Sequence, residues 1–181
     1  QSAMSYLESG NLSAAETAFK AALAMYPEYV GENNAYEGLA SIYRARGQTA
    51  DLIGVLTRYL HLAEDEVDAA LELSALHAQR GDLASAATML ERSLHVAPYD
   101  VEVRGRLADL YDRLQHFGKA VDHRRAVVAL DPPDRAGAYY RLARTLHGGG
   151  QTGQARRAVL HSLEIAPDFR DAQKLLLEIT E

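Results

Sequence analysis

The apolar residues of this chain recur at intervals of three and four positions. Leu73 and Leu76, and likewise Leu107 and Leu110, are three residues apart, a spacing that places side chains on one face of an α-helix. Clusters of valine, isoleucine and threonine, which favour strands, are nearly absent. The pattern therefore predicts an all-α chain with helices at about 1–9, 12–25, 32–46, 49–62, 66–80, 83–96, 100–114, 117–129, 135–148, 151–165 and 168–180.

Two markers repeat in phase with these predicted helices. The first is a turn residue, glycine in all but one case, and the spacings from each turn to the next are 37, 34, 34 and 35 for Gly10, Gly47, Gly81, Gln115 and Gly150. The second is a proline 17 residues beyond four of the five turns, at Pro27, Pro98, Pro132 and Pro167. A fixed period of this length predicts an array of helical hairpins.

Each recurring residue type has a physical reason. Two helices approach to about 8–10 Å only where their side chains are small, and this explains the alanines before and after each turn. Glycine tolerates the positive φ that ends a helix, and proline cannot continue one. Asp100 and Asp134 follow Pro98 and Pro132 by two residues, where each is predicted to cap the next helix.

These features together resemble the tetratricopeptide repeat. The first unit fits the family pattern throughout, with Ala3, Tyr6, Gly10, Ala15, Phe19, Ala22 and Pro27, whereas the second departs after Gly47 with Leu52, Leu56, Tyr59 and Glu64. The resemblance covers almost the whole chain. It implies one right-handed superhelical solenoid of antiparallel helix pairs over 1–181, with repeats at about 1–29, 33–66, 67–100, 101–134 and 136–169 and a capping helix at 168–180.

The resemblance also implies a concave groove, lined by the first helix of each repeat, that binds a peptide or a segment of a partner protein. Carried over position by position, the groove residues are Asn34, Glu37, Ser41, Arg44, Asp68, Gln79, Glu102, Asp109, Asp112, Arg113, Tyr140, Arg144 and His147. Its middle is acidic, which favours a basic partner, although such residues are also common as ordinary solvated charges. Tyr140 and Arg144 are interpreted as an anchor for the partner or as a self-contained pair on one helix.

Composition narrows the range of functions. The 181 residues carry a formal net charge of -6, which argues against a general nucleic-acid binder and against electrostatic attachment to anionic lipids. The absence of cysteine excludes disulfides and thiolate metal sites. No apolar run approaches the ~20 residues that span a bilayer. We expect a soluble protein; a cytoplasmic location is favoured, and a periplasmic one is left open if the chain belongs to a longer exported protein.

The sequence shows no pattern typical of catalysis. None of the seven histidines stands in an H-E-x-x-H arrangement. The acidic run Glu64, Asp65, Glu66 and Asp68 lacks the spacing of a calcium loop, and the glycines at 148–150 lack the lysine of a phosphate-binding loop. The sequence therefore predicts no catalytic residue, no cofactor and no metal site.

Three functions remain at this stage. The first is a protein-interaction scaffold without enzymatic activity. The second is the non-catalytic repeat region of a larger bacterial enzyme, because residues 131–179 resemble repeat tails of peptidase-like proteins. The third is self-assembly into a homo-oligomer through the first repeat, whose opening residues are missing.

Overall fold

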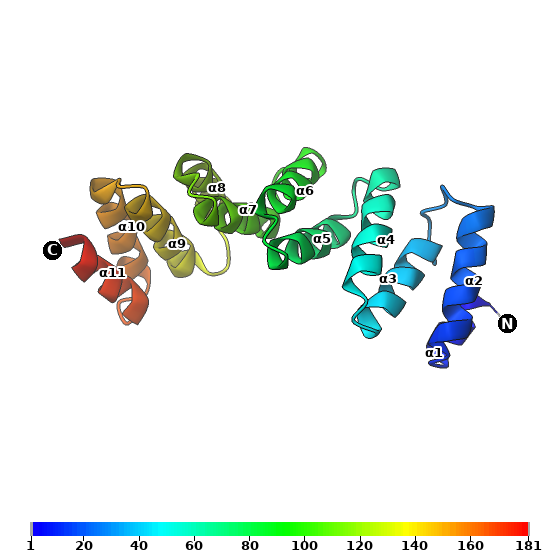
Figure 1. The fold of residues 1–181 in the computed structure, drawn as a ribbon. Coiled ribbons are helices and arrows are strands. Elements are labelled where there is room, and N and C mark those ends of the chain that lie inside the picture. The colour runs from blue at the N-terminus through cyan, green and yellow to red at the C-terminus, as the bar shows by residue number, and fades with distance from the viewer. Residues whose placement is uncertain (1, 181) are drawn as a thin grey trace. The chain divides into compact units, whose positions relative to one another are not determined.

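The computed structural model describes residues 2–180, and its secondary structure there consists of eleven α-helices with no strand (Figure 1). Gln1 and Glu181, which the predicted first helix and the predicted array include, lie outside the described residues. The predicted fold class, an all-α helical repeat, is confirmed. None of the helices within residues 2–180 is long and apolar enough to cross a membrane.

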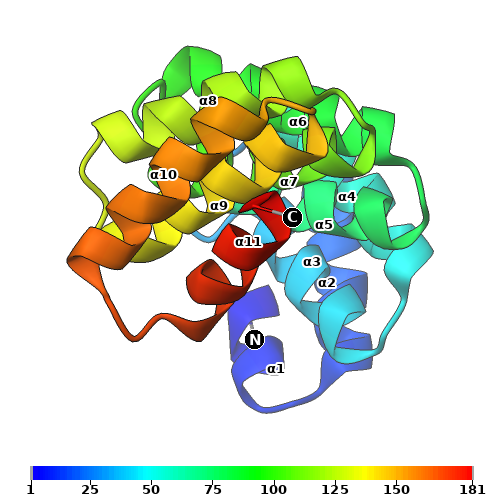
Figure 2. The same cartoon turned by 90° about the vertical axis from the view of Figure 1, so that its left-hand side faces the viewer.

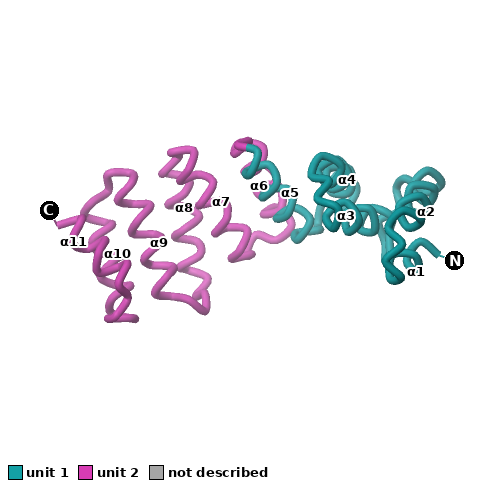
Figure 3. Tube along the Cα trace, turned by 60° about the horizontal axis from the view of Figure 1, so that its bottom comes forward, with its two compact units in different colours: residues 1–80 teal, residues 81–181 magenta. Residues whose placement is uncertain are grey.

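The chain divides into two compact units, residues 1–80 and 81–181, coloured separately in Figure 3. The division falls at the turn of the predicted third repeat, 67–100. The single array over the whole chain, with its right-handed superhelical arrangement, therefore stays a prediction.

The first unit contains α1 (Ala3–Glu8), α2 (Leu12–Met25), α3 (Ala35–Ala45), α4 (Thr49–Leu62) and α5 (Val67–Gln79). Helix α3 packs against α1, α2 and α4, and α4 also packs against α5. Side chains of α3 form the core of the unit: Tyr36, Leu39 and Ile42 are all at most 2% exposed.

The second unit contains α6 (Leu83–Val96), α7 (Val101–Arg113), α8 (Phe117–Ala129), α9 (Arg135–Gly148), α10 (Thr152–Ile165) and α11 (Arg170–Thr180). Figure 2 shows α11 beside α9 and α10, where Leu175 and Ile179 join the apolar core of this unit. Leu177 lies on the outer side of α11 and is 65% exposed, because it follows Leu175 by two residues, about 200° around the helix.

The hairpin turns have the backbone conformation that the glycine pattern predicts. Gly10, Gly47, Gly81 and Gly150 all have positive φ, between 65° and 83°. Gln115 occupies the same place in the fourth turn and adopts φ 59° without being glycine. A side chain in this region costs on the order of 1 kcal/mol, so the packing of α7 on α8 holds the turn in shape.

Small residues lie where two helices of a hairpin meet, as expected. Ala15, Ala108, Ala120, Ala143 and Ala155 are each fully buried. The predicted caps are also present: the Oδ1 atoms of Asp100 and Asp134 accept hydrogen bonds from the backbone N–H groups of Val103 and Gly137, both at 2.8 Å.

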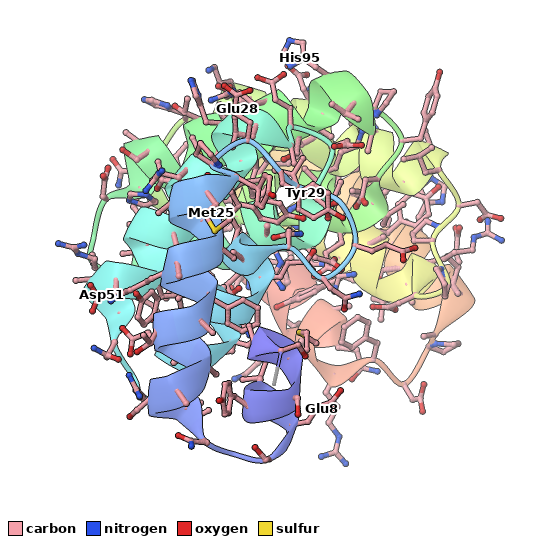
Figure 4. The ribbon with its side chains drawn as sticks, turned by 90° about the vertical axis from the view of Figure 1, so that its right-hand side faces the viewer. Glu8, Met25, Glu28, Tyr29, Asp51 and His95 are labelled. Carbon is pink, nitrogen blue, oxygen red and sulfur yellow. The ribbon has the colours of Figure 1, made fainter. Side chains whose placement is uncertain are left out.

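The connection between α2 and α3, residues 26–34, is longer than the one between α4 and α5, residues 63–66. Its backbone is held in place, because the Tyr36 hydroxyl donates to the Pro27 carbonyl at 2.5 Å and the Asn34 amide donates to the Gly31 carbonyl at 2.9 Å. Met25 and Tyr29 are exposed around it by 69% and 54% (Figure 4). The extra residues of the first period, 37 against 34, are therefore accommodated in this connection.

Candidate functional site

A pocket of about 330 Å³ opens in the first unit between α3 and α5. We call it the α3–α5 groove. Its lining comprises Glu37, Ala40, Ser41 and Arg44 from α3, Leu56 and Tyr59 from α4, and Asp68, Ala69 and Glu72 from α5. The α3 side chains are spaced by three and four residues, so one face of that helix forms one wall of the groove.

The floor of the groove departs from the repeat pattern at Tyr59, where a small residue is typical. Tyr59 is 3% exposed and stacks on Tyr36 with 5.7 Å between ring centroids. Its hydroxyl donates a 2.9 Å hydrogen bond to Oε1 of Glu37. Burial, and then this bond to a carboxylate, raise the pKa of Tyr59 well above its usual value. Tyr59 is therefore a neutral donor that holds Glu37 at the groove wall.

One ion pair bridges the two walls of the groove. The Arg44 guanidinium donates from Nε and Nη2 to the two carboxylate oxygens of Glu72, both at 2.7 Å. This bidentate geometry is the strong form of such a pair, and the hydrogen bond to Glu72 raises the pKa of Arg44. The bridge links α3 to α5 across the groove.

The remaining charge of the groove is negative. Glu37 and Asp68 are both exposed, and within residues 2–180 neither is paired with a cation. Arg44 is the one cationic side chain in the lining, and it is already paired with Glu72. The groove therefore presents two unneutralised carboxylates above a largely apolar floor.

The structure brings four of the predicted groove residues together: Glu37, Ser41, Arg44 and Asp68. Gln79 is exposed at the end of α5 but does not line the pocket. Asn34 requires a correction, since it is only 2% exposed. Its side chain caps α3 by accepting from the Glu37 backbone N–H at 3.0 Å, which is also why α3 begins at residue 35 and not at 32.

In the second unit, the predicted acidic residues are already paired. Arg124, on α8 and 2% exposed, donates to Asp109 at 2.5 Å and to Asp112 at 3.4 Å. The Thr145 hydroxyl also donates to Asp112 at 2.8 Å. Reversing both aspartates would place two cations against a buried arginine, so such a variant would report on folding as well as on partner binding.

The other predicted residues of the second unit do not form one site. Glu102 pairs with Arg106 at 2.8 Å, and Tyr140 packs on Phe169 with ring centroids 5.1 Å apart. Arg113 and Arg144 are exposed, whereas His147 is partly buried with its Nδ1 covered and unbonded. The contact of Tyr140 with Phe169 gives this ring a packing role.

Sequence reasoning missed five lining residues of the α3–α5 groove, and Tyr59 and Glu72 are the two polar ones among them. Tyr59 carried a signal, because a large aromatic side chain stands where the repeat pattern wants a small one. Glu72 carried a weaker signal, because it stands where family members that clamp a carboxylate have an amide or a cation; its contact with Arg44, 28 positions away in the sequence, places it in the groove.

Comparison with known proteins identifies the family. Tetratricopeptide repeat models match residues 1–63 and 136–169, together more than half of the chain. The chain therefore belongs to the tetratricopeptide repeat family. No curated protein sequence matches it.

Solved structures agree in fold. The crystal structure of YrrB, a TPR protein with an unusual peptide-binding site, is 19% identical with TM-score 0.71, over 95% of this chain and 87% of that chain. A crystal structure of MamA is 19% identical with TM-score 0.68, over 90% and 86%. The first TPR of Spaghetti (RPAP3), bound to the HSP90 peptide SRMEEVD, is 22% identical with TM-score 0.55, over 61% and 87%. At these identities the likeness shows the fold alone.

Proposed function

We propose that this chain is a protein-interaction scaffold whose α3–α5 groove binds a positively charged segment of a partner protein. The observation that carries the proposal is the pair of unneutralised carboxylates, Glu37 and Asp68, beside an apolar floor. A lysine or arginine side chain can lay its aliphatic stem on that floor and place its charged end between the two carboxylates. The proposal assigns no catalysis to the chain.

The negative charge of the α3–α5 groove disfavours an acidic peptide. Members of this family that clamp a carboxylate use lysine and asparagine side chains, and here the corresponding lining offers Glu37, Ser41 and Glu72. The RPAP3 relative was solved with the acidic peptide SRMEEVD. The same peptide is therefore a suitable negative control for this chain.

The strength of binding follows from the exposure of the carboxylates. Each exposed ion pair contributes about 0.2–1 kcal/mol, so removal of both is expected to weaken binding by roughly 2-fold to 30-fold. Since screening weakens exposed pairs, the affinity must also fall as salt is raised.

The experiment is a fluorescence-anisotropy titration with a labelled, end-capped lysine-rich peptide and, in parallel, with SRMEEVD. Glu37→Gln with Asp68→Asn keeps the shapes and leaves an acceptor for the Tyr59 hydroxyl. Asp65→Asn is the matched control, an exposed aspartate of the same unit that does not line the groove. We expect weaker binding of the lysine-rich peptide only in the double variant; equal affinity in all three proteins would refute the proposal.

The two alternatives stay predictions. No feature of the α3–α5 groove favours a role as the repeat region of a larger enzyme or as a self-assembly surface. Self-association is tested by light scattering of the unmodified chain.

A further inference from the structure

The first unit has a second pocket, also of about 330 Å³, that shares no lining residue with the α3–α5 groove. We call it the α2–α4 pocket, because α2 and α4 form its two walls above α3. Tyr36, Leu39 and Tyr43 of α3 form its floor, and all three are less than a tenth exposed. No residue predicted from the sequence as a binding residue belongs to it.

The α4 wall of the pocket includes two small residues, Ala50 and Gly54, which leave space in it. Ala50 and Gly54 are four apart, so they lie on one face of the helix. A Cβ added to Gly54 would meet nothing within 4 Å. An aromatic or aliphatic side chain can therefore enter over the rings of α3 without any rearrangement of the core.

Two cations lie at the rim of the pocket. The Lys20 ammonium stands 6.0 Å from the ring centroid of Tyr43, and the Arg58 guanidinium stands 5.9 Å from that of Tyr36. Lys20 is paired with Glu16 at 2.6 Å. Arg58, in contrast, is exposed and makes no ion pair within residues 2–180, so its donors remain available to a ligand.

One carboxylate, Asp51, also lines the pocket (labelled in Figure 4) and accepts a hydrogen bond from Gln48 at 3.2 Å. Because Lys20 is paired with Glu16, the charges left in the lining are one cation, Arg58, and one carboxylate, Asp51, whereas the α3–α5 groove leaves only carboxylates. The cation–π contact between Arg58 and Tyr36 keeps the guanidinium beside the apolar floor. The pocket thus combines an apolar cavity with an adjacent free cation.

We propose that the α2–α4 pocket binds a partner segment in which an aromatic or aliphatic side chain is followed directly by a carboxylate. The apolar side chain fills the space over Gly54, and the carboxylate takes a bidentate pair of hydrogen bonds from Arg58, whose planar donors match it. The site is separate from the α3–α5 groove, and its unpaired cation, Arg58, selects a carboxylate where the groove carboxylates select a cation, so the two sites favour different segments.

The test uses a fluorescein-labelled peptide, Gly-Ser-Phe-Glu-Phe-Glu-Ser-Gly, and the same peptide with glutamine in place of glutamate. Binding is followed by anisotropy and by ¹H–¹⁵N NMR shifts. Arg58→Gln removes the free cation, and Gly54→Leu fills the cavity while raising helix propensity. Matched controls are Arg156→Gln and Gly153→Leu, which alter an exposed arginine and an unhindered glycine of α10. Thermal melts confirm that each variant is folded.

We expect the glutamate peptide to bind and to shift amides of α2 and α4. Loss of a charge-assisted hydrogen bond weakens binding by roughly tenfold or more, so Arg58→Gln should lower the affinity to that of the glutamine peptide. Gly54→Leu should abolish binding, and both controls should leave it unchanged. The groove variant Glu37→Gln with Asp68→Asn should also leave it unchanged, which separates this result from that of the proposed function.

Three outcomes would overturn the proposal. One is equal affinity for the glutamate and glutamine peptides, and another is full binding by Gly54→Leu. The third is a dimer of the unmodified chain that Gly54→Leu converts to a monomer, since the occupant would then be a second copy of this chain.

Discussion

The buried Arg124 allows a quantitative test of the second unit. Replacing it with methionine keeps most of the volume and removes the charge that Asp109 and Asp112 face. Asp109 is 57% exposed in its side chain, so water replaces the lost partner and that pair contributes only about 0–1 kcal/mol. Asp112 is 19% exposed, and its Oδ1 is covered and already unbonded.

The loss of unfolding free energy in Arg124→Met therefore arises mainly from Asp112, which is left without its cation. Breaking a fully buried ion pair costs about 3–5 kcal/mol; because Asp112 retains some exposure and the hydrogen bond from Thr145, we expect a loss of about 2–3 kcal/mol for Arg124→Met. Asp112→Asn alone keeps the Thr145 bond and should cost about 1 kcal/mol. The double variant should cost less than the sum of the two, because it no longer strands a charge.

The assay is urea unfolding followed by far-ultraviolet circular dichroism, with the free energy of unfolding extrapolated to water for all four proteins. Arg125→Met is the control, since Arg125 is an exposed neighbour that contacts Gln154 at 2.7 Å. Strict additivity of the two changes, or a cost for Arg124→Met no greater than that of the control, would refute the reasoning.

Two further predictions concern glycine and pH. A Cβ at Gly38 would lie 2.3 Å from the Phe19 ring, whereas Gly54 faces open space. We therefore expect Gly38→Ala to destabilise the first unit by about 1–3 kcal/mol and Gly54→Ala to stabilise it by about 0.5–1 kcal/mol. Urea unfolding measures both changes, and equal effects of the two substitutions would contradict this reasoning. Burial, and then the nearby Arg104, lower the pKa of His123 below its usual 6.5, so the unfolded chain takes up protons first as pH falls. The part of the unfolding free energy that depends on neutral His123 should be present above pH 6.5 and be lost as the pH falls below it. His123→Gln should flatten that decline in unfolding curves recorded across pH.

The helices and turns could be predicted from the sequence because they depend on local chemistry. Gly47 and Gly81 mark turns wherever positive φ is needed, and Asp100 caps a helix through an atom three residues from its donor. Contacts between side chains of different helices were harder to predict. The helical period places Asp109 on a groove face, but it does not reveal that Arg124 reaches the same face from the next helix.

The candidate site shows the same limit. Glu37, Ser41, Arg44 and Asp68, which the repeat register predicts to be binding residues, line one pocket, and their binding role stays a prediction. Asn34 has the same register as a groove residue, yet its side chain is used by the backbone of α3. A repeat pattern specifies where a Cβ points, and it cannot specify which neighbouring group the rest of the side chain satisfies.

The anchored connection between α2 and α3 has a consequence for how such chains can vary. Its hydrogen bonds tie Pro27 and Gly31 to side chains of α3 or its cap. Added length is therefore looped out locally and does not shift the register of α3 on α2. A repeat junction of this kind can lengthen and change the character of the local surface while each helical neighbour keeps its own packing.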